Sequence, residues 1–355
     1  MKDLYCLAIE SRCDETSMSI VKNGDTEICT MTVTQIDIHK KFGGVVPEIA
    51  SRSHIESITI VLDELLTKAN ITIDDIDFIG VTYGPGLIGS LLIGVECAKT
   101  ISFITKKPLV PVHHIAGHIY ANNLNKRLEF PLIALVVSGG HTDLVYMDKD
   151  YSFKRIGSTL DDAIGEAYDK VAKILGLDYP GGPKVDKLAH LGEDTYNLPY
   201  PLDDNSYNFS FSGIKSAVVN LVHNEKQRGN DIRIEDVCTT FQNRVVHIIT
   251  KKTKKAIEEY KVKNLIIAGG VAANSGLRDS LTEMAKLEKI NFSMPELRLC
   301  TDNAAMIGAA AYYAYKLKIT SDLTLNAKAI DSLYERNDKN DWYRNFKIRS
   351  QRNNI

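Results

Sequence analysis

The feature that most constrains the fold is an order of secondary-structure elements that occurs twice along the chain. Apolar and alternating runs predict three strands at residues 4–9, 17–21 and 27–35, connected by short polar turns. A long helix, a fourth strand and a second helix follow, and a similar order begins again at residue 132. Because strands that alternate with helices are typical of α/β folds, the repeat predicts a duplicated α/β domain with a ligand-binding cleft between the copies.

Turn residues mark where the other elements begin and end. Pro47 suits the first turn of a helix that we expect to end near residue 70, and residues 42–46 are expected to form a flexible loop before it. Residues 178–211 predict a long irregular segment of the kind that often carries function. The other expected strands are 78–83, 109–112, 132–137, 142–147, 151–157 and 264–268, and the other expected helices are 115–122, 162–175, 214–224, 235–259 and 303–318.

The length of the chain, 355 residues, is enough for two domains. We expect an N-terminal lobe at residues 1–128, completed by a helix within 303–330, and a C-terminal lobe at residues 129–302. Residues 337–355 are polar and basic, which predicts a flexible tail.

The composition is that of an ordinary globular protein from a reducing compartment. Hydrophobic residues make up 44% and charged residues 25% of the chain. The six cysteines are scattered without a C-x-x-C pair, so we expect neither a disulfide framework nor a cysteine metal site. The first strand begins too early for a signal peptide, and no apolar run looks long enough to cross a bilayer. These features predict a cytoplasmic protein with no membrane association.

The net charge of −2 excludes nucleic-acid binding by overall charge alone. Any such binding would need a local basic face or a partner protein. Basic side chains gather at residues 251–255 and in the tail at Arg344, Lys347, Arg349 and Arg352. Such clusters are usually solvated surface, and they can also contact RNA phosphates.

Two histidines one helical turn apart are the clearest candidates for metal ligands. His114 and His118 stand at positions i and i+4, on one helix face, where two imidazoles can bind one cation. Such a pair can equally be a polar helix face, and His113 is the weaker candidate because it points elsewhere. Asp302 is our candidate for a third ligand. Two histidines and one carboxylate leave coordination positions open, as a catalytic metal site requires.

Two Gly-rich turns follow predicted strands, at the positions where open α/β sheets bind ligands. Residues 138–142 can present backbone N–H groups to a phosphate, although an ordinary hairpin turn is the simpler interpretation. Residues 269–274 combine such a turn with a helix N-terminus, which is a better site for an anion or a nucleotide. Neither segment matches G-x-G-x-x-G or a Walker loop, so a dinucleotide or P-loop site is not favoured.

Several carboxylates lie near these turns in the second half. Asp161 or Asp162 is expected to cap the helix that follows. Asp169 lies further along the same helix and shares this half of the chain with Asp186, which is a candidate to hold a ribose hydroxyl.

Taken together, these motifs resemble the tRNA threonylcarbamoyladenosine synthase family, whose catalytic subunits are of the TsaD type. They occur in order from about residue 4 to residue 318, so their joint specificity is high. The matching segments are residues 13–16, 43–48, 84–87, 113–118, 137–141, 161–162, 165–170, 179–183, 209–213, 269–274 and 300–303.

The resemblance implies a fold, a reaction and partners. The fold is that of actin, Hsp70 and sugar kinases (ASKHA), with two duplicated α/β lobes around a central cleft. The reaction moves a threonylcarbamoyl group from threonylcarbamoyl-AMP to N6 of the adenosine 3′ of the anticodon, tRNA position 37, in tRNAs that read codons starting with A. The implied cofactor is one divalent metal per subunit, iron(II) or else zinc. The implied partners are tRNA, a TsaB-like dimerisation partner of related fold and a TsaE-like small ATPase.

The resemblance also assigns residues. The family's metal ligands map onto His114, His118 and Asp302. In the first turn, Asp14 or Glu15 is expected to orient the attacking amine or to relay its proton. The family's substrate contacts map onto Val136, Val137, Ser138, Gly139, Gly140, Asp169, Gly182, Asp186 and Asn274.

One residue departs from the family pattern. Arg12 occupies a place in the first turn where the family usually has a small serine or threonine. It is expected either to clash there or to add a positive charge that faces the phosphates of the donor.

Three other classes of protein compete with this interpretation. A metalloprotease would need H-E-x-x-H, whose glutamate is absent because residues 115–117 are Ile-Ala-Gly. A sugar or acyl kinase of the same fold would explain the Gly-rich turns, but it would not explain the histidine pair with Asp302. A non-catalytic nucleotide-binding scaffold could lose its metal ligands, whereas this chain retains all three.

Overall fold

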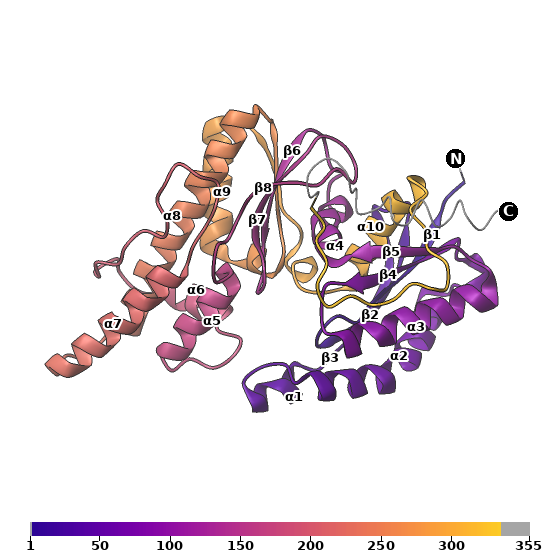
Figure 1. The fold of residues 1–355 in the computed structure, drawn as a ribbon, viewed down its shortest axis with the longest axis horizontal. Helices are drawn as coiled ribbons and strands as arrows, with labels where there is room; N and C mark the ends of the chain where they lie inside the picture. Colours follow the sequence, from indigo (N-terminus) through magenta and orange to yellow (C-terminus); the bar gives the residue numbers. More distant parts are fainter. Residues whose placement is uncertain (1, 335–355) are drawn as a thin grey trace. The chain divides into compact units, whose positions relative to one another are not determined.

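Figure 1 shows the chain in a computed structural model that describes residues 2–334. The tail predicted at residues 337–355, with its basic cluster, lies outside the described residues. The chain divides into two compact units. The first unit contains Met1–Leu128, Lys149–Phe153 and Thr301–Ile355, and the second contains Glu129–Asp148 and Lys154–Cys300.

A five-stranded mixed sheet lies at the centre of the first unit (Figure 1). Its strands are β1 (Tyr5–Glu10), β2 (Glu15–Lys22), β3 (Thr26–Thr34), β4 (Phe78–Gly84) and β5 (Leu109–His113), in the spatial order β3-β2-β1-β4-β5. The first three strands are antiparallel, and β4 and β5 continue the sheet in parallel with β1. The β2–β3 turn contains Asn23 and Gly24, which both have positive φ, 55° and 74°, as is common in tight hairpins.

Two groups of helices pack on this sheet. Helices α2 and α3 contact each other and the sheet, whereas α10 contacts the sheet and α4. The bounds are α1 Ile36–His39, α2 Pro47–Ala69, α3 Ile88–Thr105, α4 His114–Tyr120 and α10 Ala304–Lys316, with 3₁₀ turns at Lys40–Phe42, Ile73–Asp75 and Ala121–Leu124.

Small residues let α10 lie close to the sheet. A Cβ atom on Gly80 of β4 would lie 2.6 Å from the Cβ atom of Ala311, and one on Gly308 would lie 2.5 Å from Val21. Neither contact is sterically possible, so glycine is required at both positions. This close packing brings Asp302, two residues before α10, against α4.

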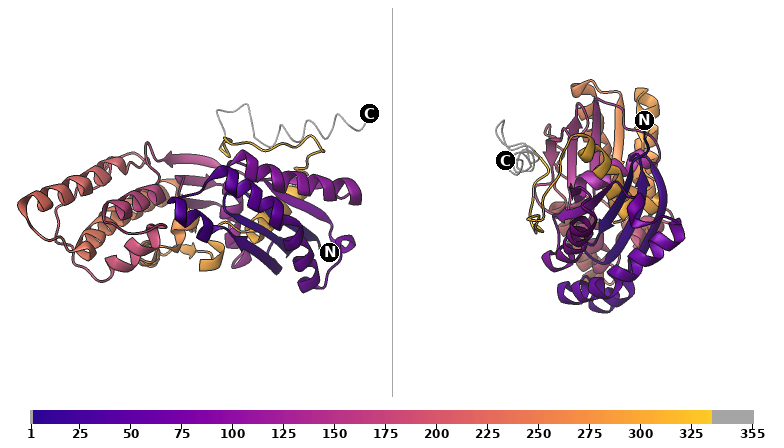
Figure 2. Two further views of the ribbon diagram at one scale, coloured as in Figure 1. Left: turned by 90° about the horizontal axis from the view of Figure 1, so that it is seen from below. Right: turned by 90° about the vertical axis from the view of Figure 1, so that its right-hand side faces the viewer.

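The segment after α10 runs back over the first unit (Figure 2). Ser321 forms a bridge with Leu109 of β5. Further on, the backbone N–H of Lys328 donates to the carbonyl oxygen of Tyr83, and Gly86 N–H donates to the carbonyl oxygen of Ala329. These bonds fix the turn that follows β4, which lies next to the candidate metal ligands.

Among the described residues, α3 is long and apolar enough to cross a membrane, with a mean hydropathy of 1.4 over 18 residues. The expectation that no apolar run reaches this length was therefore wrong. The same test is passed by core helices of globular proteins. Helix α3 packs on β4 and α2, buries Leu91, Val95 and Ala98 completely, and carries an ion pair between Glu96 and Lys99. Its packing within the first unit thus accounts for its apolar sequence.

The second unit repeats the sheet of the first (Figure 1). Its strands are β6 (Leu132–Val137), β7 (Thr142–Met147), β8 (Lys154–Ser158), β9 (Asn264–Ala268) and β10 (Asn291–Ser293), in the order β8-β7-β6-β9-β10. Again the first three are antiparallel and the last two are parallel to the first. The predicted repeat of one element order is confirmed.

The helices of the second unit include one that the sequence did not predict. The bounds are α5 Ile164–Ile174, α6 Gly182–Ala189, α7 Ser212–Arg228, α8 Ile234–Tyr260 and α9 Ser275–Glu288, with 3₁₀ turns at Gly270–Ala273 and Leu297–Leu299. Helix α6 lies within the segment 178–211 that we expected to be irregular. Its Pro183 occupies the first turn, where proline favours a helix, and Val185 and Ala189 are buried where α6 packs on α8.

One short helix was not predicted, and one local expectation was wrong. Residues 36–42 form α1 and a 3₁₀ turn just before the predicted loop. Neither Asp161 nor Asp162 caps α5, whose N-cap is Ala163. Asp161 instead accepts hydrogen bonds from the backbone of Phe211 and Ser212 at the start of α7. Capping depends on which helix lies nearby in space, and the sequence neighbour was not the relevant one.

Candidate metal centre and nucleotide pocket

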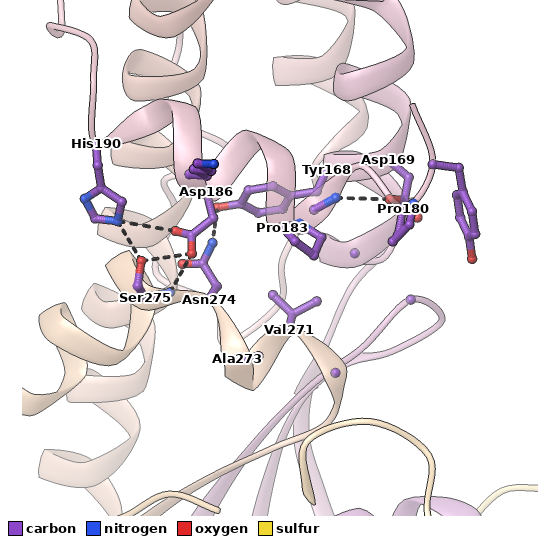
Figure 3. A pocket seen from close by; sticks show the side chains of 16 residues that line it. Tyr168, Asp169, Pro180, Pro183, Asp186, His190, Val271, Ala273, Asn274 and Ser275 are labelled. Atoms are coloured by element: carbon purple, nitrogen blue, oxygen red, sulfur yellow. Dashed lines mark hydrogen bonds and ion pairs between the residues drawn. The ribbon is translucent and has the colours of Figure 1, made fainter. Parts of the chain in front are cut away.

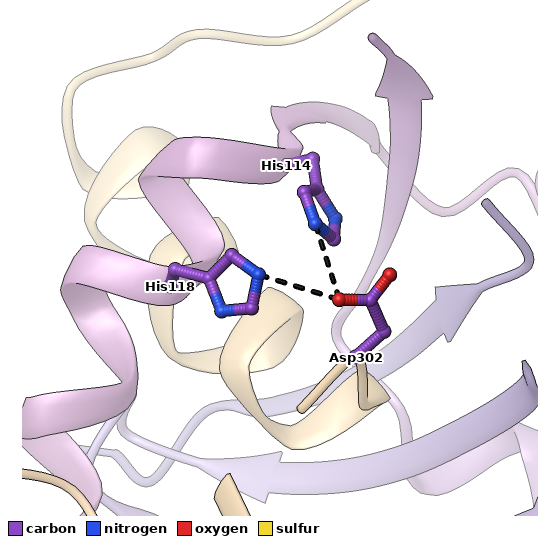
Figure 4. A group of neighbouring side chains, drawn as sticks. All are labelled: His114, His118 and Asp302. Atoms are coloured by element: carbon purple, nitrogen blue, oxygen red, sulfur yellow. Dashed lines mark ion pairs between the residues drawn. The ribbon is translucent and has the colours of Figure 1, made fainter. Parts of the chain in front are cut away.

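The three predicted metal ligands lie together in the first unit. The Nε2 atoms of His114 and His118 are each 3.3 Å from the same carboxylate oxygen, Oδ1 of Asp302. Both imidazole rings point toward that oxygen from one face of α4 (Figure 4). The ring centroids are 4.5 Å apart and the ring planes are nearly perpendicular, at 83°.

This geometry fits a divalent cation. One candidate ligand atom from each residue lies within 4.8 Å of the others. Two ligands bound about 2.1 Å from one metal at angles near 100° would be separated by roughly 3.2 Å, which agrees with the separations from Asp302. Two imidazoles and one carboxylate are also a donor set that iron(II) and zinc accept.

A buried carboxylate orients one of the two imidazoles. Oε2 of Glu10 lies 3.1 Å from Nδ1 of His114 and accepts a hydrogen bond from Thr82 at 2.8 Å. A carboxylate on Nδ1 directs Nε2 of the ring toward a metal. His118 differs, because its buried Nδ1 has no hydrogen-bond partner among the described residues. The sequence analysis missed Glu10, which lies in an apolar strand and is completely buried.

His113 has a structural position. Its Nδ1 accepts a hydrogen bond from the backbone N–H of Ile115 at 3.2 Å and so caps the start of α4. Its Nε2 lies 3.4 Å from the carbonyl oxygen of Asp331. His113 therefore supports the helix that carries the candidate ligands and is not grouped with them.

Charge coupling sets the protonation of the three candidate ligands. Burial and the nearby charge of His114 lower the pKa of His118. Burial disfavours charge on His114 as well, but the charge of Asp302 and the hydrogen bonds with Asp302 and Glu10 together outweigh it and raise the pKa of His114. Burial likewise opposes ionisation of Asp302, yet the two histidines and Arg12 hold the pKa of Asp302 well below its usual range. An ionised carboxylate and a neutral imidazole are the forms that bind metals.

Asp14 lies in the turn between β1 and β2 of the same unit, and Glu15 is the first residue of β2. Burial, a hydrogen bond with Asp14 and the charge of Asp302 raise the pKa of Glu15 to about 10. These surroundings therefore favour the protonated form of Glu15. His54 of α2 holds this turn, since its ring is 2.7 Å from Thr16 Oγ1 and 3.1 Å from the Cys13 carbonyl oxygen. Sequence reasoning missed His54, although a histidine in the apolar stripe of a helix was a usable signal.

The raised pKa gives a testable pH dependence for Glu15→Gln. Because the folded-state pKa of about 10 exceeds the ordinary value of 4.5, the stability that Glu15 contributes is fully present below pH 4.5 and is lost as the pH rises toward 10. Glutamine cannot ionise. The variant should melt with the wild type at pH 4.5 and progressively above it as the pH rises to 9, measured by calorimetry. The exposed Glu64→Gln should show no such divergence, and parallel curves for Glu15→Gln would contradict the assignment.

A second candidate site is a cavity of about 450 Å³ within the second unit (Figure 3). It lies among α5, α6 and the turn that leads into α9. Five of the predicted substrate contacts line it, namely Gly139, Asp169, Gly182, Asp186 and Asn274. The other four predicted contacts, Val136, Val137, Ser138 and Gly140, are not among its lining residues, and both valine side chains are completely buried in β6.

Glycines bring the two predicted turns together beside this cavity. A Cβ atom on Gly165, at the start of α5, would lie 2.8 Å from Gly139 Cα. Gly269 has a φ of +95°, and a Cβ atom there would lie 2.4 Å from the carbonyl oxygen of Val137. Only glycine allows both approaches. By contrast, a Cβ atom on Gly270 would meet nothing within 4 Å, so this residue presents bare backbone to the cavity.

A network of polar side chains forms one wall of the pocket (Figure 3). Asp186 accepts hydrogen bonds from Ser275 N–H at 2.9 Å, from Ser275 Oγ at 2.8 Å and from Gln242 Nε2 at 2.9 Å. Asn274 caps α9 through Leu277 N–H at 2.8 Å and donates to Gln242 Oε1 at 2.9 Å. The predicted contacts Asp186 and Asn274 are therefore tied together by Gln242, which the sequence analysis did not single out.

Asp169 of α5 holds the loop that leads into α6. Its Oδ1 accepts hydrogen bonds from the backbone N–H groups of Gly181 at 2.8 Å and Gly182 at 3.2 Å. Burial raises the pKa of Asp169, against the effect of these two bonds. Asp169 thus shapes the pocket by fixing the loop that enters α6.

The lysines of the basic cluster at residues 251–255 form hydrogen bonds and ion pairs within the protein. Buried Lys252 donates to Asp204 at 2.6 Å and to two backbone carbonyls. Lys251 pairs with Asp203 at 2.6 Å, and Lys255 donates to the carbonyl oxygen of Asn205. These lysines fasten the segment before α7 to α8, which favours the structural interpretation of the cluster over contact with RNA.

Comparison with known proteins shows the family of the chain. It matches the family model of TsaD, tRNA N6-adenosine threonylcarbamoyltransferase, over residues 27–309. The chain belongs to this family. The enzyme of that name from Staphylococcus saprophyticus is 58% identical over 321 residues, which cover 90% of this chain and 94% of the relative. The one from Staphylococcus haemolyticus is 56% identical over 328 residues, covering 92% and 96%.

Membership of the family makes the chain a transferase and confirms the resemblance that the motifs indicated. The kinase and scaffold alternatives are not favoured. Among solved structures, HypF from T. kodakarensis is similar with a TM-score of 0.61 and 13% identity, covering 89% of this chain and 48% of that one. Full-length HypF in its phosphate- and nucleotide-bound form has a TM-score of 0.58 and 14% identity, covering 88% and 46%. At such identities the similarity concerns the fold alone, and it confirms the ASKHA class.

Proposed function

We propose that the chain transfers the threonylcarbamoyl group from threonylcarbamoyl-AMP to N6 of the adenosine 3′ of the anticodon, tRNA position 37, in tRNAs that read codons starting with A, and releases AMP. The observation that carries the proposal is the grouping of His114, His118 and Asp302 in a chain of the TsaD family. A small-molecule kinase would have no use for these three ligands. We further propose that the two compact units are the two lobes of the ASKHA fold.

The triad is proposed to hold one divalent metal per subunit, iron(II) with zinc as the alternative. Two histidines and one carboxylate with open positions suit iron(II), and zinc accepts the same donors. When bound, such a metal supplies a Lewis acid for oxygens of the acyl donor. Glu10 keeps the ring of His114 in its ligating orientation, and the ionised Asp302 supplies the negative charge that the cation needs.

The pocket of the second unit is proposed to bind the adenylate part of the donor. Its volume of about 450 Å³ suits a nucleotide-sized ligand. Gly139, Gly182 and Gly270 offer backbone without obstructing side chains, and Asp169, Asp186 and Asn274 supply a polar wall. Val136, Val137, Ser138 and Gly140 remain predicted contacts, and the buried valines could contribute only through their backbone.

We assign the proton chemistry to the first turn. Attack of N6 on the carbamoyl carbon forms the new C–N bond, breaks the bond to the phosphate oxygen of AMP and releases a proton. Asp14 or Glu15 is the residue we propose to orient the attacking amine or to relay its proton, and the two carboxyl groups are hydrogen-bonded to each other.

Partners and location follow from the family and from the surface. We propose a cytoplasmic enzyme that acts with a TsaB-like partner of related fold and a TsaE-like ATPase. Helices α2 and α3 of the first unit expose large apolar side chains that would suit a helical partner, namely Ile55, Ile60, Phe103 and Ile104. With a net charge of −2, the isolated chain should bind tRNA weakly, and added salt should reduce turnover.

The function is tested by mass spectrometry of nucleosides from tRNA. The tRNA is incubated with threonine, bicarbonate, ATP, an acyl-adenylate synthase, and this chain with its partners. Threonylcarbamoyladenosine should form in the complete system and be absent when the chain is omitted. Its absence from a complete, metal-loaded system would leave the kinase or scaffold interpretation in place.

The nucleotide pocket is tested by Gly270→Val. The new side chain meets no protein atom at Cβ and projects from a residue that lines the cavity, so AMP affinity should fall at least tenfold while the melting temperature changes little. Calorimetric titration with AMP measures the affinity. Gly213→Val is the matched control, because its Cβ also meets nothing and Gly213 does not line the cavity. Equal affinities for the two folded variants would contradict the assignment.

A further inference from the structure

Arg12 lies directly against the candidate metal ligands. Its Nη1 is 3.2 Å from Nε2 of His114 and 3.3 Å from Oδ2 of Asp302. Nε2 is the nitrogen of His114 that faces Asp302 and would bind the metal. The guanidinium thus contacts two of the three ligand residues.

The arginine is held in this position from several sides. Its Nε donates to the carbonyl oxygen of Pro85 at 2.8 Å, and its backbone N–H donates to Glu10 at 2.8 Å. A Cβ atom on Gly86 would lie 2.5 Å from Arg12 Cγ, so the turn after β4 closes over the aliphatic stem. Gly86 is itself tied to Ala329. Only 22% of the Arg12 side chain is exposed, so the charge is fixed beside the ligands and does not extend into solvent.

We propose that Arg12 lowers the affinity of the His114–His118–Asp302 site for a divalent cation, an inference that rests on the metal role proposed above. The guanidinium is hydrogen-bonded to Oδ2 of Asp302 and to Nε2 of His114. Both atoms are therefore less available to a metal ion. The positive charge of Arg12 also repels the divalent metal ion. At these separations inside a protein, this repulsion is large and little screened by salt. A serine at this position would have neither effect.

The experiment compares the wild type with Arg12→Ser, Arg12→Gln and Arg12→Lys in the full chain. Dissociation constants for Zn²⁺ and Co²⁺ are measured by competition with a chelator of known affinity. We expect Arg12→Ser and Arg12→Gln to bind each metal about tenfold or more tightly than the wild type. Arg12→Lys keeps the charge and should stay within about threefold of the wild type. Two neutral variants of different size guard against a folding defect in either one, and circular dichroism confirms their fold.

His118→Ala separates failure of this proposal from failure of the metal assignment. If His118→Ala loses the metal while Arg12→Ser and Arg12→Gln bind it no more tightly than the wild type, the role of Arg12 is overturned and the metal site stands. If His118→Ala binds as the wild type does, the triad is not the metal site and both proposals fall. Weaker binding by Arg12→Ser would show that the arginine supports the site, which also overturns the inference.

Discussion

Replacing His118 with alanine is expected to weaken divalent-metal binding by more than about 100-fold and to stop formation of threonylcarbamoyladenosine. Even residues that only support a metal ligand change affinity by about 10–100-fold when replaced, and His118 points directly at the shared oxygen of Asp302 at 3.3 Å. Removing it leaves one imidazole and one carboxylate. Elemental analysis of the purified protein and the nucleoside assay measure the two effects on the same sample.

The neighbouring His113→Asn provides the control for His118→Ala. His113 is as deeply buried, but it ends β5 and acts as the N-cap of α4. Asparagine is itself a good N-cap, so this variant should keep both the fold and the metal. Equal metal content in His118→Ala and His113→Asn would show that the triad does not hold the metal.

The second large effect is expected for Asp186→Ala, which should destabilise the second unit by about 3 kcal/mol and lower AMP affinity at least tenfold. The carboxylate accepts three short hydrogen bonds from Ser275 and Gln242. Alanine leaves the Ser275 donors at the start of α9 and the Gln242 amide of α8 without this acceptor, and bonds to a charged group are the costly ones to lose. Loss of Gln242's partner also loosens Asn274, which lines the same pocket.

Chemical denaturation and calorimetric titration with AMP measure the two consequences of Asp186→Ala. Asp178→Ala is the matched control, because Asp178 also lies near α6 but pairs with Lys184 at a position where its side chain is 91% exposed. An exposed ion pair contributes about 0–1 kcal/mol, so this variant should resemble the wild type. Indistinguishable unfolding curves and AMP affinities for the two variants would refute the role given to Asp186.

The local sequence pattern was sufficient to predict a helix or strand wherever that element is defined by its own residues. Strands β6, β7 and β9 have the bounds that their apolar runs predict, because each run is buried along its length and is ended by turn residues. The pairing of His114 with His118 is likewise local, since i and i+4 share a helix face. Helix α6 was missed because its Gly and Pro residues are typical of loops, and its two buried apolar residues were too few to show a period.

The amino-acid sequence by itself determined the repeated α/β order, the family and the identity of the three candidate metal ligands. It could not show Glu10 behind His114, Arg12 beside Asp302 or Gln242 between Asp186 and Asn274. Those contacts join residues that are distant along the chain, and no spacing rule encodes them. The contacts of Glu10 and Arg12 exist because β1 lies beside β4 and because α10 packs closely on the sheet through Gly80 and Gly308. The contacts of Gln242 exist because α8 packs on α6 and α9, so the environment of each predicted ligand was decided by tertiary packing.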